Sequence, residues 1–227
     1  MKRLMAIAAL ALAQAGCVAN QGDAAVRFLD ARALTFEEGV GCTPADDFVI
    51  GSGLLDLSGS LNYLLAMSVE TNNSVQSITV NQEEFSGQGL SDITLNEIVY
   101  SYKFMPQGGT DATNLIDTEE ETSAIYRVLR PGTSAEESYV FMNAFGPKAV
   151  AALPGKGAGT VFATIKARGR LSSGQTVESN KFTFPVTVYT SGATYDCTDP
   201  DTKPAGTCVR GQDVLVPSGS NGCVDAT

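Results

Sequence analysis

Short runs of alternating apolar and polar residues recur through most of the chain, and this alternation constrains the fold more than any other feature. Successive side chains of a β-strand point to opposite faces, so a period of two is typical of a strand with one buried face. The clearest runs are residues 61–69, 98–104, 139–145, 161–168 and 176–189. We therefore expect an all-β fold, an antiparallel β-sandwich of roughly seven to nine strands that is immunoglobulin-like in the broad sense. Closure of the strands into a barrel is the alternative.

One segment favours a helix. Pro147 suits the first turn of a helix, and residues 147–153 predict the one short helix of the fold. Ser134-Ala135-Glu136-Glu137 has the form of a capping box, so a helix from Ser138 competes with the strand over 139–145. The alternating aromatic residues of that segment favour the strand. Pro185 has no backbone N–H to give to a ladder, so it indicates a sheet edge or a bulge within 176–189.

The first seventeen residues follow a different pattern. Lys2 and Arg3 form a cationic head, residues 4–13 are apolar, and Ala15-Gly16-Cys17 ends the segment with small residues. This is the pattern of an export signal. The apolar stretch is too short to cross a bilayer of roughly 30 Å as a helix. An ordinary signal peptide, cut after Ala13 or Ala15, would leave Cys17 as a free thiol or a disulfide partner.

Ala15, Gly16 and Cys17 also resemble the lipobox of bacterial lipoproteins, with Gln14 where that family usually has leucine or another aliphatic residue. The resemblance implies that residues 1–16 are a lipoprotein signal peptide and that Cys17 is lipidated as the first mature residue. Residues 17–25 would then be the lipidated cysteine and a tether to the membrane. Several acyl chains make such an anchor permanent. Val18 replaces the aspartate that often signals inner-membrane retention, which favours an outer-membrane location facing periplasm or cell surface.

The cysteine count supports this interpretation. The chain has five cysteines, and lipidation of Cys17 leaves an even number for two disulfides in an oxidising compartment. The four are Cys42, expected in a loop between the first two strands, and Cys197, Cys208 and Cys223, and three connectivities are open. No C-x-x-C pair occurs, which argues against a zinc site, and no metal is predicted. We expect a β-sandwich domain over 26–190 and a disulfide-stabilised, loop-rich tail over 191–227.

Composition excludes several classes of function. With 15 basic and 25 acidic residues, a net charge of −10 and no basic patch, the chain is not expected to bind nucleic acid. The absence of histidine excludes His-based triads and His-ligated zinc. Residues 153–160 resemble a phosphate-binding loop only superficially, because Gly157 follows Lys156 where such a loop needs Ser or Thr. No catalytic residue and no cofactor is predicted, and we expect no enzyme.

Two function classes remain. The first, which we favour, is a lipid-anchored envelope lipoprotein that acts as a structural, adhesive or accessory-subunit protein through contact with a protein partner. The alternative is a small-molecule or calcium-dependent binding module that uses the acidic loop 106–122. Carboxylate oxygens are the ligands that calcium prefers. The candidates are Asp111, Asp117, Glu119, Glu120 and Glu121 in that loop, and a second, weaker cluster at Asp196, Asp199 and Asp201.

Overall fold

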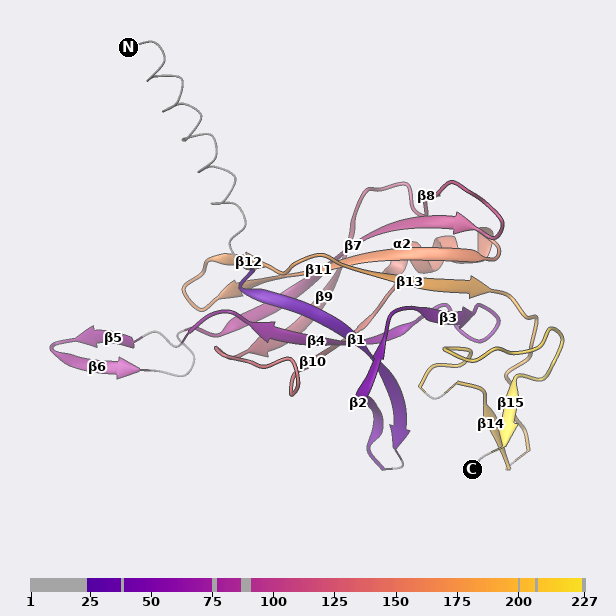
Figure 1. The fold of residues 1–227 in the computed structure, drawn as a ribbon, viewed down its shortest axis with the longest axis horizontal. Coiled ribbons are helices and arrows are strands. Elements are labelled where there is room, and N and C mark those ends of the chain that lie inside the picture. The colour runs from indigo at the N-terminus through magenta and orange to yellow at the C-terminus, as the bar shows by residue number, and fades with distance from the viewer. Residues whose placement is uncertain are drawn as a thin grey trace, which may run out of the picture.

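Two β-sheets form most of the molecule (Figure 1). The computed structural model describes residues 24–37, 39–74, 77–86, 91–199, 201–206 and 208–225 of the 227-residue chain. The predicted signal peptide and Cys17 lie outside these residues, so the lipobox is not part of the structural description.

The smaller sheet is antiparallel and has the strand order β10-β4-β1-β2. The larger sheet has the order β3-β13-β11-β7-β8, and in it β9 also pairs with β7 and β12 with β11. The β3–β13 pair is parallel and the other pairs are antiparallel. The smaller sheet comprises β1 (Val26–Glu37), β2 (Gly41–Ile50), β4 (Leu64–Thr71) and β10 (Tyr139–Asn143). The larger comprises β3 (Gly53–Asp56), β7 (Ile93–Pro106), β8 (Thr113–Asn114), β9 (Glu121–Leu129), β11 (Gly159–Leu171), β12 (Thr176–Glu178) and β13 (Phe182–Tyr189).

Two small two-stranded antiparallel sheets complete the strands that the structure describes. One is the hairpin of β5 (Ser77–Val80) and β6 (Glu83–Ser86), and the other pairs β14 (Thr202–Pro204) with β15 (Cys223–Asp225) in the tail. The described residues contain more strands than the predicted seven to nine. Several of the additional strands have only two to four residues, which is too short for an alternating pattern to be recognised in the sequence.

The main hydrophobic core lies between the four-stranded sheet and the seven-stranded sheet. Every second side chain of β11 is buried from Val161 to Ala167, as the alternation predicts. Facing residues come from both sheets, and the rings of Tyr63 and Phe184 lie 5.6 Å apart across the interior. Burial of apolar area on this scale is the main stabilising term of such a fold. The predicted β-sandwich is confirmed, and the sheets do not close into a barrel.

Residues 139–143 of the segment 139–145 form strand β10, so the competing helix from Ser138 is wrong. Within β10 the buried side chains are Val140 and Met142, which lie between the alternating residues that indicated the strand. Val140 pairs with Met67 of β4, and a cross-strand pair shares one face of the sheet. Because Met67 is in the core, Val140 is buried and Phe141 is 45% exposed.

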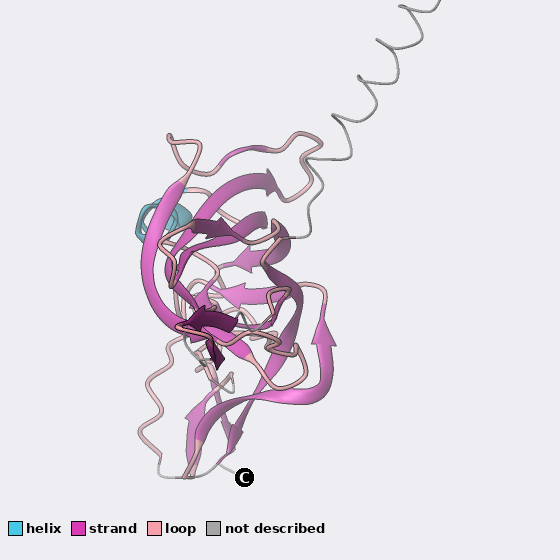
Figure 2. Cartoon of the chain, turned by 90° about the vertical axis from the view of Figure 1, so that its left-hand side faces the viewer, coloured by secondary structure: helices cyan, strands magenta, loops and turns pink. Residues whose placement is uncertain are grey.

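The predicted short helix is also confirmed. Helix α2 (Pro147–Ala152) continues into the 3-10 turn η1 (Leu153–Gly155), and Ala149 and Leu153 bury their side chains in the core. Figure 2 shows α2 at the outer side of the strands. Strand β3 begins opposite Val186, so Pro185 lies where β13 is still a sheet edge. In the described part of the chain, no helix is long and apolar enough to cross a membrane.

Candidate functional site

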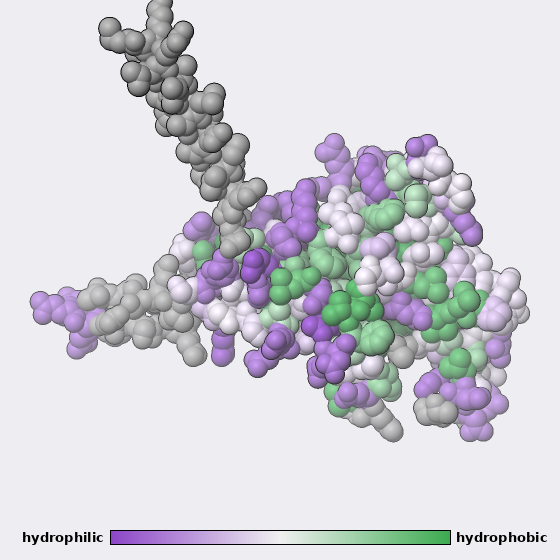
Figure 3. All heavy atoms as spheres, in the orientation of Figure 1, coloured by the Kyte–Doolittle hydropathy of each residue, from purple (hydrophilic) through white to green (hydrophobic). Residues whose placement is uncertain are grey.

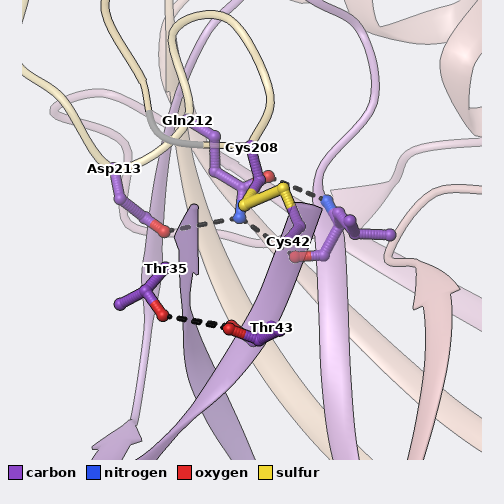
Figure 4. Close-up of a disulfide and its surroundings, with 7 residues drawn as sticks. Thr35, Cys42, Thr43, Cys208, Gln212 and Asp213 are labelled. Carbon is purple, nitrogen blue, oxygen red and sulfur yellow. Dashed lines mark hydrogen bonds between the residues drawn. A yellow bond between two sulfur atoms is a disulfide. The ribbon is translucent and has the colours of Figure 1, made fainter. Parts of the chain in front are cut away.

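Two disulfides connect the tail to itself and to the sandwich. Cys42 and Cys208 are bonded across 166 positions, and Cys197 and Cys223 across 26. The four predicted cysteines therefore form two disulfides, in one of the three open connectivities. The expectation that Cys42 lies in a loop is wrong: it belongs to β2, because β1 and β2 stay paired through Phe36 and Cys42 up to the turn. The bond to Cys208 holds the tail against this strand (Figure 4).

The residues just after Cys208 bind the sandwich directly. The Gln212 amide accepts a hydrogen bond from Leu64 N at 2.9 Å and donates one to Leu64 O at 3.0 Å (Figure 4). The Asp213 carboxylate accepts from Tyr63 Oη at 2.8 Å and from Leu54 N at 3.0 Å. Burial and the charge of Asp213 raise the pKa of the Tyr63 hydroxyl well above its ordinary value. The tail thus supplies partners for polar groups that the sandwich alone would leave unpaired.

A second set of hydrogen bonds between tail and sandwich surrounds Asp56, the last residue of β3, whose side chain is fully buried. We call this set and the bonds of Gln212 and Asp213 the two latches. Its carboxylate accepts hydrogen bonds from Ser58 N and Ser191 N at 3.0 Å each, from the Ser191 hydroxyl, and from Tyr195 Oη at 2.8 Å. Burial by itself raises the pKa of Asp56, and the bonds from Ser191, Ser58 and Tyr195 more than offset this, so the net pKa lies below the ordinary 3.8. Tyr195 also belongs to a small apolar cluster within the tail, with Ala193, Ala205 and Val216.

The Cys42–Cys208 bond holds a projecting two-stranded segment against the tail, and the two latches bind the tail to the sandwich. We call residues 34–37 and 39–50, in the outer parts of β1 and β2 and the turn, the ribbon; it leaves the body in Figure 1. Four of the ten large apolar side chains that are exposed in the described part of the chain lie on it: Phe36 (60% exposed), Val40 (70%), Phe48 (66%) and Val49 (55%). Figure 3 shows apolar residues over the ribbon and the adjoining part of the body. Such a concentration of exposed apolar groups is typical of an interaction surface.

The ribbon also carries an unpaired strand edge and negative charge. Strand β2 is the last strand of its sheet, so one side of its backbone has no ladder partner. Pro44 on this strand has no backbone N–H to donate, which limits unspecific pairing of the edge with strands of other molecules. Glu37, Asp46 and Asp47 are exposed, and none forms an ion pair among the residues that the structure describes. The surface therefore fits a partner with an apolar face and a basic border.

The carboxylates of the acidic loop do not converge. Asp111, Asp117, Glu119 and Glu120 are exposed, whereas Glu121 is only 5% exposed. Across the described ranges, no group of three Asp, Glu, His or Cys side chains could hold a metal ion, and this includes the cluster at Asp196, Asp199 and Asp201.

Glu121 has a structural role that the sequence did not reveal. Its carboxylate accepts hydrogen bonds from Lys148 N at 2.8 Å and from Ala149 N at 3.2 Å, so it caps the first turn of α2 from the start of β9. Gly146 makes room for it, since a Cβ at that position would lie 2.6 Å from the Glu121 carboxylate. Within the run Glu119-Glu120-Glu121, no local signal distinguishes the buried member from its neighbours.

Glu121→Ala is expected to lower the free energy of unfolding by about 1–2 kcal/mol, because two backbone N–H groups lose their partner. Urea denaturation followed by circular dichroism measures the change. Glu120→Ala removes a neighbouring exposed carboxylate and should change stability by less than about 0.5 kcal/mol. Equal effects of the two substitutions would contradict the capping role.

Comparison of the chain with protein-family models, with curated proteins and with solved structures finds no match. The features of the chain that point to a function are the ribbon, the latches and the sequence pattern of residues 1–17.

Proposed function

We propose that this chain is an exported envelope protein, held at the outer membrane by acyl chains on Cys17, that works by binding a partner protein through the ribbon. The observation that carries the proposal is the set of exposed apolar side chains on a segment that a disulfide fixes in place. Disulfides persist in oxidising compartments, which agrees with the export signal of residues 1–17.

We expect the ribbon to bind its partner with useful affinity, although its surface is small, because the disulfide holds it in one conformation before binding. A flexible hairpin would lose conformational entropy on binding, and a braced one loses less. The Cys42–Cys208 bond ties the ribbon to a tail that is itself held by Gln212 and Asp213. Phe36 and Phe48 are then the anchors, since buried aromatic side chains supply much of the energy at protein interfaces.

The contact is tested with the double variant Phe36→Ser/Phe48→Ser. Tyr126→Ser on β9 is the matched control, because Tyr126 is 80% exposed and lies off the ribbon. We expect the wild-type protein, extracted from envelopes in mild detergent, to migrate as a complex larger than the monomer. The double variant should migrate as a monomer or bind the isolated partner at least about tenfold more weakly, while the control retains binding. Loss of binding in the control alone, or unchanged binding in the double variant, would place the contact elsewhere.

The anchor is tested separately with Cys17→Ser. We expect this variant to be soluble after envelope fractionation and to keep the melting temperature of the wild-type protein, because the anchor contributes membrane affinity and not folding energy. Fractionation by ultracentrifugation and thermal melting measure the two properties. A variant that still sediments with membranes would contradict lipidation as the means of attachment.

A further inference from the structure

A cavity between the acidic loop and helix α2 has the features of a ligand site. Its volume is about 600 Å³, within the range of small-molecule sites. Residues 115–118, which connect β8 to β9, form one wall, and α2 with η1 forms the other. Figure 1 shows β8 and α2 together at one end of the molecule.

The floor of this cavity is apolar. Leu115 and Ile116 close its base and are only 2% and 7% exposed, so the accessible apolar lining comes mainly from Ala151, which is exposed, and Ala152, which is half-buried. The helical wall is fixed, because Glu121 caps the first turn of α2 and Leu153 is buried at its end. A fixed apolar floor favours a ligand with an apolar body.

The rim is cationic in a protein of net charge −10. Lys148 and Lys156 line the cavity together with a single acid, Asp117. In the described part of the chain neither lysine forms an ion pair, and the Lys148 ammonium makes only a 3.4 Å contact to Thr118 Oγ1. Two ammonium groups without a carboxylate partner, at the mouth of an apolar cavity, favour an anion.

We propose that this cavity binds a small organic anion with an apolar body and one carboxylate, such as a medium-chain fatty acid. The apolar body lies along Ala151 and Ala152 above Ile116, and the carboxylate lies between the ammonium groups of Lys148 and Lys156. Thr118 Oγ1 adds a hydroxyl donor to the carboxylate. The site shares no residue with the ribbon, so it does not depend on the proposed contact function.

The test uses octanoate, 1-octanol and octylamine, which share one chain length and differ in the charge of the head group. The full chain carries Cys17→Ser, so that the result does not depend on the proposed lipid anchor. Titrations of isotope-labelled protein are followed by NMR. We expect octanoate to bind more tightly than octanol, octylamine to bind most weakly, and the shifted amides to cluster in residues 115–118 and 148–156.

Variants separate charge from packing. Lys148→Gln/Lys156→Gln should weaken octanoate binding about tenfold and leave octanol binding unchanged, and Asp117→Asn should strengthen octanoate binding about twofold. Ala151→Phe should block all three probes by filling the cavity. Lys181→Gln, an exposed lysine outside the cavity, is the charge-matched control. Equal binding of octanoate and octanol, shifts in other residues, or no saturable binding of octanoate would each overturn the proposal.

Discussion

Removal of the Cys42–Cys208 disulfide, as Cys42→Ala/Cys208→Ala, is expected to lower the free energy of unfolding by about 5 kcal/mol. A cross-link reduces the entropy of the unfolded chain, and the reduction grows with the loop that it closes, which here spans 166 positions. The same relation gives about 3.5 kcal/mol for Cys197–Cys223, which spans 26. Urea denaturation of both double variants under oxidising conditions measures the difference.

The Cys42→Ala/Cys208→Ala variant also tests whether the tail unfolds together with the sandwich. Because Gln212 and Asp213 pair with strands of the sandwich, loss of Cys42–Cys208 should destabilise the whole molecule and not only the tail. Two separate unfolding transitions in the Cys42→Ala/Cys208→Ala variant, the second at the wild-type midpoint, would show that the tail folds independently.

Asp56→Ala is expected to cost about 3 kcal/mol or more. Four donors, from Ser58 N, Ser191 N, the Ser191 hydroxyl and Tyr195 Oη, lose their acceptor in a buried site. Denaturation at neutral pH measures the loss. Asp111→Ala, which removes an exposed carboxylate, is the control and should change stability by less than about 0.5 kcal/mol.

The pH dependence gives this latch a second signature. The pKa of Asp56 is lower in the folded protein than its ordinary value of 3.8, so the unfolded chain binds the proton more readily. The stabilising contribution is therefore complete above the ordinary value and is lost as the pH falls through the lower, folded-state value. Asp56→Asn should remove this part of the acid sensitivity. An unchanged acid midpoint in that variant would show that another carboxylate controls unfolding at low pH.

The sequence predicts the local elements well and the contacts between distant elements poorly. The alternation in 161–168 and 182–188 identifies β11 and β13 and their buried faces, because one strand's pattern depends only on its own residues. In β10 the alternation predicts the strand but does not identify its buried face, since register with β4 decides which side chains enter the core. Where both faces carry apolar residues, only the partner strand resolves the choice.

The latches are harder still to predict. Asp56 meets Ser191 across 135 positions, and Asp213 meets Tyr63 across 150, so no local pattern marks either carboxylate as buried. The disulfide pairing is open for the same reason, because spacing along the chain does not determine which cysteines meet. Charge count alone also suggested Glu121 as a calcium ligand, whereas its burial makes it a helix cap.

We propose that the protein is a disulfide-braced, exported scaffold attached to the envelope through one acylated cysteine. Intact mass of the protein extracted from membranes, alkylated with and without prior reduction, tests this proposal. We expect an N-terminus at Cys17 that carries acyl chains, no alkylation before reduction, and alkylation of the four remaining cysteines after it. An unacylated N-terminus at another residue, or thiols that react without reduction, would contradict it.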